Sequence, residues 1–318
     1  MVIPRSSKEN ELVSIVVPVL NEELGLKTFW MRLESVLKSE KEYKFEVLFI
    51  DDGSSDNSLN ALREIASLSN GIKVRVISLS RNFGHQAALV CGLEKSNGAA
   101  VLTIDADLQD PPELIPTLLN EWARGSDIVL AQRRIRDGET LFKKISASWF
   151  YRFLSRISEY QIPEDVADFR LMSRRSVAAL LKLEDYEPYL RGMVSFIGFP
   201  QTIVQYDRDA RYAGTSSYKM TDMFRLARNG IVGFSGKPLK FATFLGSFVL
   251  LITLLYSGYI VISKIVNPAS ALPGYTSLMV VLLVSFGVQM LTLGIIGNYL
   301  YRTLSQTRNR PRYIIAEE

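Results

Sequence analysis

The chain has 318 residues, of which 47% are hydrophobic and 22% are charged, with one cysteine and a formal net charge of +4. These proportions exclude a disordered chain and a coiled coil, and the single cysteine excludes a disulfide scaffold. The length predicts about two domains, and the modest positive charge fits a protein beside an anionic membrane better than a nucleic-acid-binding one.

Short apolar runs alternate with amphipathic stretches over the first 130 residues. The apolar runs are rich in β-branched residues, which predicts strands buried on both faces, and the stretches between them predict helices. This alternation indicates an α/β domain with a mostly parallel sheet, in which ligands bind beyond the carboxyl ends of the strands. The predicted strands are 12–19, 45–50, 74–79, 99–104 and 127–131, and the predicted helices include 23–37 and 58–67.

Polar residues follow the first two predicted strands. Segment 18–23 ends the first strand, and Asp51 and Asp52 end the second, before a glycine and small hydroxyl residues. Carboxylates in such a turn can accept hydrogen bonds from a ribose or from the N–H of a base. A helix N-cap at Ser55 or Asp56 is the alternative, but it does not explain the aspartate pair.

An Asp-x-Asp pair follows the fourth predicted strand. Asp105 and Asp107, with Gln109, offer hard oxygen ligands of the kind that suits Mg²⁺ or Mn²⁺. A cation held there would neutralise a diphosphate leaving group, and Pro111 or Pro112 then opens a helix. The chain has neither a glycine-rich dinucleotide motif nor a phosphate-binding loop motif. We therefore expect carboxylates and a metal to hold any nucleotide.

The region after residue 140 is expected to be mainly helical up to about residue 190. A short amphipathic stretch at 216–231 predicts a helix at a membrane interface, with an ordinary surface helix as the alternative.

Residues 241–301 carry a single charge, Lys264, where 22% of 61 residues would be about 13. The runs 241–263 and 275–301 are each long enough to cross a bilayer as a helix, and proline and glycine between them favour a turn. This pattern predicts a hairpin of two membrane-spanning helices. Two buried core helices, the alternative, would need a larger soluble fold around them.

Lysines and arginines flank both predicted spans, which places the body and both termini in the cytoplasm. The first 14 residues have no apolar segment like that of a signal peptide. Glycines in the second span allow close helix packing, so a homo-oligomer, with a tetramer as one possibility, is expected. The predicted parts are a catalytic domain at 1–212, a juxtamembrane segment at 213–240, two spans within 241–301 and a basic tail at 302–318.

Four motifs, in order, carry a resemblance to a known family. They are 13–23, 50–56, 80–88 and 105–113. They resemble family 2 glycosyltransferases with the GT-A fold, and among these the polyisoprenyl-phosphate glycosyltransferases such as dolichol-phosphate mannose synthase and the bactoprenol glucosyltransferases. The resemblance covers nearly the whole chain and includes the two-helix anchor. The chain departs from the family pattern at Leu20, where tyrosine is common, and at Ser217, where lysine often stands.

This resemblance implies a set of site residues. The nucleotide-sugar pocket would be lined by Pro18, Asn21, Glu22, Asp51, Asp52, Arg81 and Gly84. The metal and donor diphosphate would be held by Asp105, Asp107 and Gln109, with Arg211 on the diphosphate. Asp168 would orient an arginine or act as a weak base. Because arginine binds phosphate oxygens in pairs, the acceptor phosphate is assigned to Arg133, Arg136, Arg170 and Arg208. His85, the only histidine, is expected to shape the nucleotide loop rather than to take part in acid–base chemistry.

The implied reaction is an inverting transfer of a hexose, with glucose from UDP-glucose preferred, to a polyisoprenyl phosphate at the cytoplasmic membrane face. Three alternatives stay open: synthesis of another glycolipid, use of GDP-mannose, and a membrane protein that binds nucleotide sugars without turnover. A processive synthase is not expected, because the chain has no Gln-x-x-Arg-Trp motif.

Overall fold

The computed structural model describes residues 11–134, 166–183, 188–207, 237–266, 274–308 and 310–318. The described residues fall into two compact units, one that holds the sheet and its helices and one that holds α9 and α10. The predicted interfacial helix at 216–231 lies outside the described residues.

One eight-stranded sheet forms the first unit, in the order β7-β5-β6-β4-β1-β2-β3-β8. Four of the seven neighbouring pairs are parallel, and β6 and β8 are antiparallel to their neighbours. All five predicted strands are present, which confirms the α/β fold with a mostly parallel sheet. The strands are β1 (Glu11–Val19), β2 (Tyr43–Asp51), β3 (Lys73–Leu79), β4 (Ala100–Thr103), β5 (Ile128–Arg133), β6 (Val166–Ser173), β7 (Gln201–Tyr206) and β8 (Ile315–Glu317).

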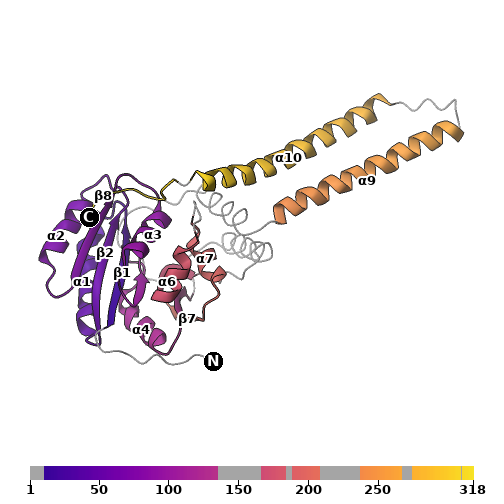
Figure 1. Cartoon of the computed structure of the whole chain (residues 1–318). Coiled ribbons are helices and arrows are strands. Elements are labelled where there is room, and N and C mark those ends of the chain that lie inside the picture. Colours follow the sequence, from indigo (N-terminus) through magenta and orange to yellow (C-terminus); the bar gives the residue numbers. More distant parts are fainter. Residues whose placement is uncertain (1–10, 135–165, 184–187, 208–236, 267–273, 309) are drawn as a thin grey trace. The chain divides into compact units, whose positions relative to one another are not determined.

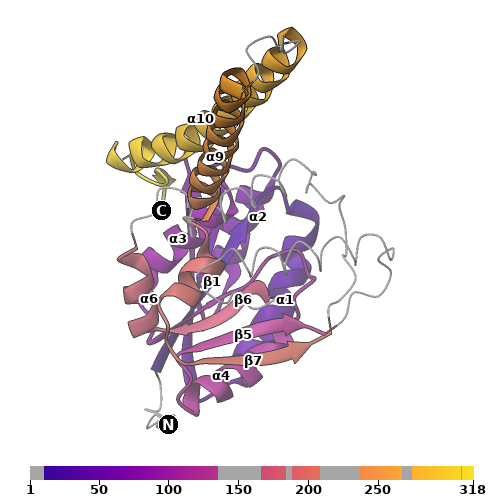
Figure 2. The same cartoon turned by 90° about the vertical axis from the view of Figure 1, so that its right-hand side faces the viewer.

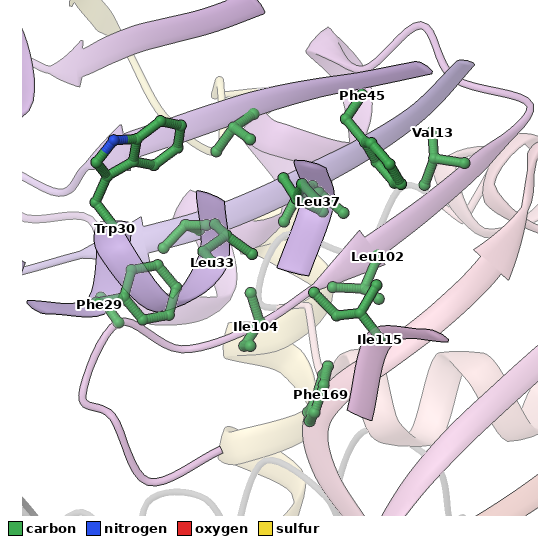
Figure 3. Close-up of a cluster of buried hydrophobic side chains, with 14 of the residues drawn as sticks. Val13, Phe29, Trp30, Leu33, Leu37, Phe45, Leu102, Ile104, Ile115 and Phe169 are labelled. Atoms are coloured by element: carbon green, nitrogen blue, oxygen red, sulfur yellow. The ribbon is translucent and has the colours of Figure 1, made fainter. Parts of the chain in front are cut away.

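Helices cover both faces of this sheet (Figure 1). Alternate residues of β1, such as Val13 and Val17, point into a core shared with α1, α2 and α4 (Figure 3). On the other face α3 lies against β1 so closely that a side chain on Gly92 would collide with Val16. The helices of this unit are α1 (Glu23–Ser39), α2 (Ser58–Leu68), α3 (His85–Lys95), η1 (Pro112–Leu114), α4 (Ile115–Ala123), α6 (Arg174–Leu181) and α7 (Leu190–Phe196).

The strand β6 corrects the expectation that residues 140–190 are mainly helical. It lies between β4 and β5, at the end of the sheet that Figure 2 shows beside α4. Asp168 and Arg170 are both buried in it and form an ion pair. A charged pair that neutralises itself inside a strand is not visible in a hydrophobicity pattern, which explains why the sequence did not indicate a strand here.

The segment expected as a basic tail, 302–318, contains regular structure that the sequence did not indicate. The helix α10 continues to Thr307, and Ile315–Glu317 then joins the sheet as β8, antiparallel to β3. The physical reason is the open edge of β3, because its backbone groups need partners.

The second unit contains two long helices, α9 (Lys237–Val266) and α10 (Tyr275–Thr307), at the positions of the expected spans. Lys264, which directly follows the first expected span, lies within α9. Within the part of the chain that the structure describes, no helix meets the length and apolarity needed to cross a membrane. The predicted membrane-spanning hairpin is therefore not confirmed.

Candidate active site

The loops after β4, β1, β2 and β3 meet at one edge of the sheet, because these four strands are adjacent and parallel. The polar residues predicted to form a site follow these strands. The fold therefore brings the 18–23, 51–56, 80–84 and 105–109 segments together at the place where ligands bind in sheets of this type.

Asp51 and Asp52 are almost fully buried, at 1% and 2% exposed. Asp52 accepts hydrogen bonds from the backbone N–H groups of Phe83, at 2.8 Å, and of Gly84, at 2.9 Å. Asp51 accepts one from the Ser78 hydroxyl at 3.2 Å. Burial raises the pKa of Asp52, and the two backbone donors oppose that rise. The aspartate pair thus holds the loop after β3 in place.

Asn21 connects the loops after β1 and β2. It lies at a positive φ of 54°, its side-chain oxygen accepts from Ser55 N at 2.8 Å, and its own N–H donates to Ser54 Oγ at 3.0 Å. Next to it, Glu22 N donates to Ser58 Oγ at 2.9 Å. These contacts fix the shape of the turn that the sequence assigned to a nucleotide.

Two further predicted nucleotide-pocket residues differ in exposure. Pro18 is buried within β1, beside Ile50 of β2. Arg81 is exposed, and its guanidinium lies 4.0 Å from the centre of the Phe83 ring. Gly84 has a φ of 100° and precedes α3, a conformation that favours glycine.

The acidic turn after β4 is tightly folded. Gln109 N donates to Asp107 Oδ1 at 3.1 Å, across Leu108 at a φ of 60°. Nowhere among the described residues do three or more His, Cys, Asp or Glu side chains gather as a metal site. Two carboxylates nevertheless fit Mg²⁺, which is commonly held by one or two carboxylates while phosphate oxygens and water complete its shell.

Asp168 is the centre of a charged cluster next to this turn. It pairs with buried Arg170 and accepts from Arg191 Nη2 at 3.2 Å. Gln86 Nε2 lies 3.5 Å from Asp168 Oδ2, and His85 Nε2 lies 3.4 Å from the same oxygen. His85 Nε2 is also 3.6 Å from Asp105 Oδ1. His85 therefore bridges the acidic turn and Asp168, a contact that the sequence did not indicate.

Charges within the cluster set its protonation. Burial raises the pKa of Asp105 to about 6 against the opposing effect of His85, and Asp110, Asp168 and Asp107 raise it further. Asp168 behaves in the opposite way, since Arg191, His85 and Arg170 outweigh burial and hold its pKa well below the usual value. Desolvation lowers the pKa of His85, but Asp105 and Asp168 raise it to about 9. An ionised Asp168 with so low a pKa is a poor base and a good anchor for arginine.

The expected acceptor-phosphate arginines are placed unequally. Arg170 is 2% exposed and bound to Asp168, so it supports that carboxylate rather than facing a ligand. Arg133 lies 3.6 Å from Asp110 and donates from Nε to the Tyr206 hydroxyl at 3.3 Å. Three assigned residues lie outside the described residues: Arg136, Arg208 and Arg211.

Sequence reasoning missed Arg191 and Gln86. The Gln86 side-chain oxygen accepts from Leu190 N at 3.0 Å, so it fastens the start of α7 to the start of α3. Arg191, with 31% of its side chain exposed, extends from this helix to Asp168. Gln86 follows the lone histidine directly in a family motif, and that was the one available signal.

Comparison with known proteins agrees with this geometry. The family model described as "Glycosyl transferase family 2" matches residues 14–181. An uncharacterised glycosyltransferase of Bacillus subtilis strain 168 is 43% identical over 302 residues, which cover 95% of this chain and 92% of the relative. The bactoprenol glucosyl transferase of Shigella phage SfX is 39% identical over 305 residues, covering 95% and 98% respectively. The chain carries an acidic turn at the carboxyl edge of a mostly parallel α/β sheet, and it matches these relatives over nearly their whole length. We conclude that the chain is a glycosyltransferase and belongs to glycosyl transferase family 2.

Proposed function

We propose that this glycosyltransferase transfers a hexose from a nucleotide diphosphate to a polyisoprenyl phosphate, with inversion at the anomeric carbon. The observation that carries the proposal is the juxtaposition of the acidic turn at Asp105 with the cationic groups around Asp168. An anionic donor and an anionic acceptor must be brought together in this reaction, and the site offers ligands for a cation beside fixed cations.

The donor would occupy the loops held by Asp51 and Asp52. Asp105 and Asp107, with Gln109, would hold a Mg²⁺ or Mn²⁺ ion, which would stabilise the negative charge on the departing diphosphate. The choice between the two metals is left to the assay. We propose UDP-glucose as the donor, and the relatives named bactoprenol glucosyl transferases support glucose as the sugar.

The acceptor would enter on the Asp168 side. A phosphate monoester has a second pKa of about 6. The lipid phosphate is therefore largely a dianion at neutral pH and needs little help from a base. Its oxygen would attack the anomeric carbon while the bond from that carbon to the diphosphate breaks. Arg133 and Arg191, both partly exposed, would bind the acceptor phosphate, and Asp168 would orient Arg191.

We further propose that the reaction takes place at the cytoplasmic face of a membrane, where α9 and α10 associate with lipid. Large apolar side chains are exposed along both helices, among them Phe244, Leu255, Ile262, Leu282, Phe286 and Leu293. A polyprenyl acceptor cannot leave the bilayer cheaply, at about 0.8 kcal/mol for each buried CH₂. Flotation of the purified protein with phospholipid vesicles on a density gradient tests this, and protein that stays behind when the vesicles float would contradict lipid association.

The test of function is transfer of labelled sugar to undecaprenyl phosphate by purified protein, with UDP-glucose and GDP-mannose as parallel donors. We expect a lipid-linked product that EDTA abolishes, and Asp105→Ala or Asp107→Ala should reduce turnover by about two to three orders of magnitude. Asp207→Ala is the matched control, since this aspartate side chain is 83% exposed. Product from GDP-mannose alone would change the sugar, and no product from either donor would contradict the proposed reaction.

A further inference from the structure

Residues 312–318, which we call the edge strap, lie along β3 and form the outer edge of the sheet (Figure 1). Ser80 N donates to Ile314 O at 2.9 Å. In the antiparallel pairing of β8 with β3, Ile315 lies opposite Leu79 and Glu317 lies opposite Ser78. The strap thus pairs with the end of β3 from which the nucleotide loop departs.

Side chains fasten the strap to α2, β3 and α3 of the same unit and to Leu183, which follows α6. Arg312 Nη2 donates to Leu183 O at 2.8 Å, and the Tyr313 hydroxyl donates to Glu94 of α3. Glu317 pairs with Arg63 of α2. Glu318 pairs with Arg75 of β3 and with Lys95 of α3, the latter at 2.8 Å. These contacts with α2, β3 and α3 hold the strap in one defined position.

The residues that the strap holds are also those that reach the aspartate pair. Ser78, opposite Glu317, donates its hydroxyl to Asp51. Ser80, bound by Ile314, leads directly into the loop whose Phe83 and Gly84 N–H groups donate to Asp52. The same loop lies against Gly53, where an added Cβ would come within 2.5 Å of the Arg81 backbone.

We propose that the edge strap is a positioning element for the donor nucleotide. By fixing Ser78 and Ser80 it fixes the 80–84 loop and, through that loop, the Asp51–Asp52 side of the pocket. This inference rests on the proposed function, in which that pocket binds a nucleotide. Residues 308–311 join the end of α10 to the strap along the chain.

The first test is deletion of residues 313–318, with calorimetric titration of UDP and of GDP, each with Mn²⁺. Cys91, the only cysteine, is buried and lies beside Tyr313, so its reaction with a thiol reagent reports whether the strap is seated. We expect Cys91 to be modified faster. We also expect the nucleotide Kd to rise by about tenfold or more, because several hydrogen bonds that hold the loop are lost. Addition of a synthetic 311–318 peptide should restore both.

A second set of variants covers the case in which the deletion protein does not fold. Glu317→Arg and Arg63→Glu each reverse one partner of an exposed pair, and the double variant restores it. Each single variant should weaken nucleotide binding by about twofold to fivefold, and the double variant should recover it. Arg124→Glu, which breaks a pair with Glu121 on α4, is the control and should leave binding unchanged.

The outcomes separate this inference from the proposed function. Suppose that full-length protein binds UDP or GDP. If the deletion protein then binds the nucleotide equally well although its Cys91 reacts rapidly, the strap only covers the sheet edge and the inference is overturned. Single variants that bind like the control would overturn it too. Full-length protein that binds neither nucleotide would overturn the proposed function, and the strap inference with it.

Discussion

The two halves of the candidate active site are built from different interactions. The nucleotide half, around Asp51 and Asp52, consists of carboxylates that accept hydrogen bonds from backbone N–H groups and a serine hydroxyl. The reaction half, around Asp105 and Asp168, consists of carboxylates that face a histidine and arginines.

In the proposed function, this difference lets one sheet edge serve two tasks. Hydrogen bonds from neutral donors to a carboxylate contribute about 1.5–3 kcal/mol each and fix the shape of the loop. Burying an ionised side chain costs several kcal/mol, and only its oppositely charged partners offset that cost. The nucleotide half is therefore held in one shape. In the proposed function, a diphosphate, metal ion or phosphate that binds would shift the balance of charge in the reaction half.

The largest expected effect comes from Asp168→Asn. It leaves Arg170 buried without its counter-charge, which should lower the free energy of unfolding by about 3–5 kcal/mol and abolish transfer. Urea denaturation and the transfer assay measure the two effects. Asp127→Asn is the control, because Asp127 is also buried and pairs with an arginine, the exposed Arg175, but precedes β5. The control should lose stability and keep activity per folded molecule. An Asp168→Asn protein as stable as the wild type would contradict the charge balance.

Arg191→Gln should separate the two halves kinetically. In the proposed function Arg191 binds the acceptor phosphate, so its loss should lower kcat/KM for the lipid by about 100-fold, and Kd for UDP with Mn²⁺ should not change. Arg191→Lys keeps the charge and should recover only part of the activity, because lysine cannot form the paired contacts. A change in nucleotide Kd equal to the change in kcat/KM would show that Arg191 belongs to the nucleotide half instead.

The pH dependence of stability should reveal Asp105 in metal-free buffer. Its pKa is raised to about 6 in the folded protein, so the stability it contributes is fully present below its unfolded pKa and is lost as pH rises through 6. Asp105→Asn should therefore gain about 1–2 kcal/mol relative to the wild type between pH 4 and pH 7. Thermal unfolding in EDTA measures this, and equal slopes for the two proteins would refute it.

Asp52→Asn should produce the smallest effect, confined to the nucleotide half. Replacing one carboxylate oxygen by an amide removes one acceptor for Phe83 N or Gly84 N and should weaken UDP binding by about threefold to tenfold. The KM for the lipid acceptor should stay the same. A larger effect on the lipid than on the nucleotide would show that the two halves are not independent.

The nucleotide half was also the more predictable half. Its strands are continuous apolar runs, and the residues after them, such as Asn21 and Asp51, belong to short local motifs. The reaction half depends on contacts between distant segments, for example Gln86 with Leu190. No local pattern marks Arg191, and β6 was hidden because Asp168 and Arg170 look polar in sequence and are neutral only as a pair.

The strand β8 could not be predicted for a related reason. It is three residues long and carries glutamate, so its sequence has almost no strand signal. Its partner β3 lies far earlier in the chain, and the pairing depends on ion pairs with Arg63, Arg75 and Lys95. Tertiary contacts, rather than local propensity, determine this strand.

The edge position of β8 also has a consequence during protein synthesis. The ribosome makes β3 early and β8 only after α9 and α10, so the β3 edge cannot be covered while these helices are being made. An open strand edge is a template for aggregation, which makes this interval the most vulnerable one for the nascent chain. A chain whose synthesis stops within α10 would keep the β3 edge unpaired. Chaperones and proteases could then recognise the truncated protein by this exposed edge.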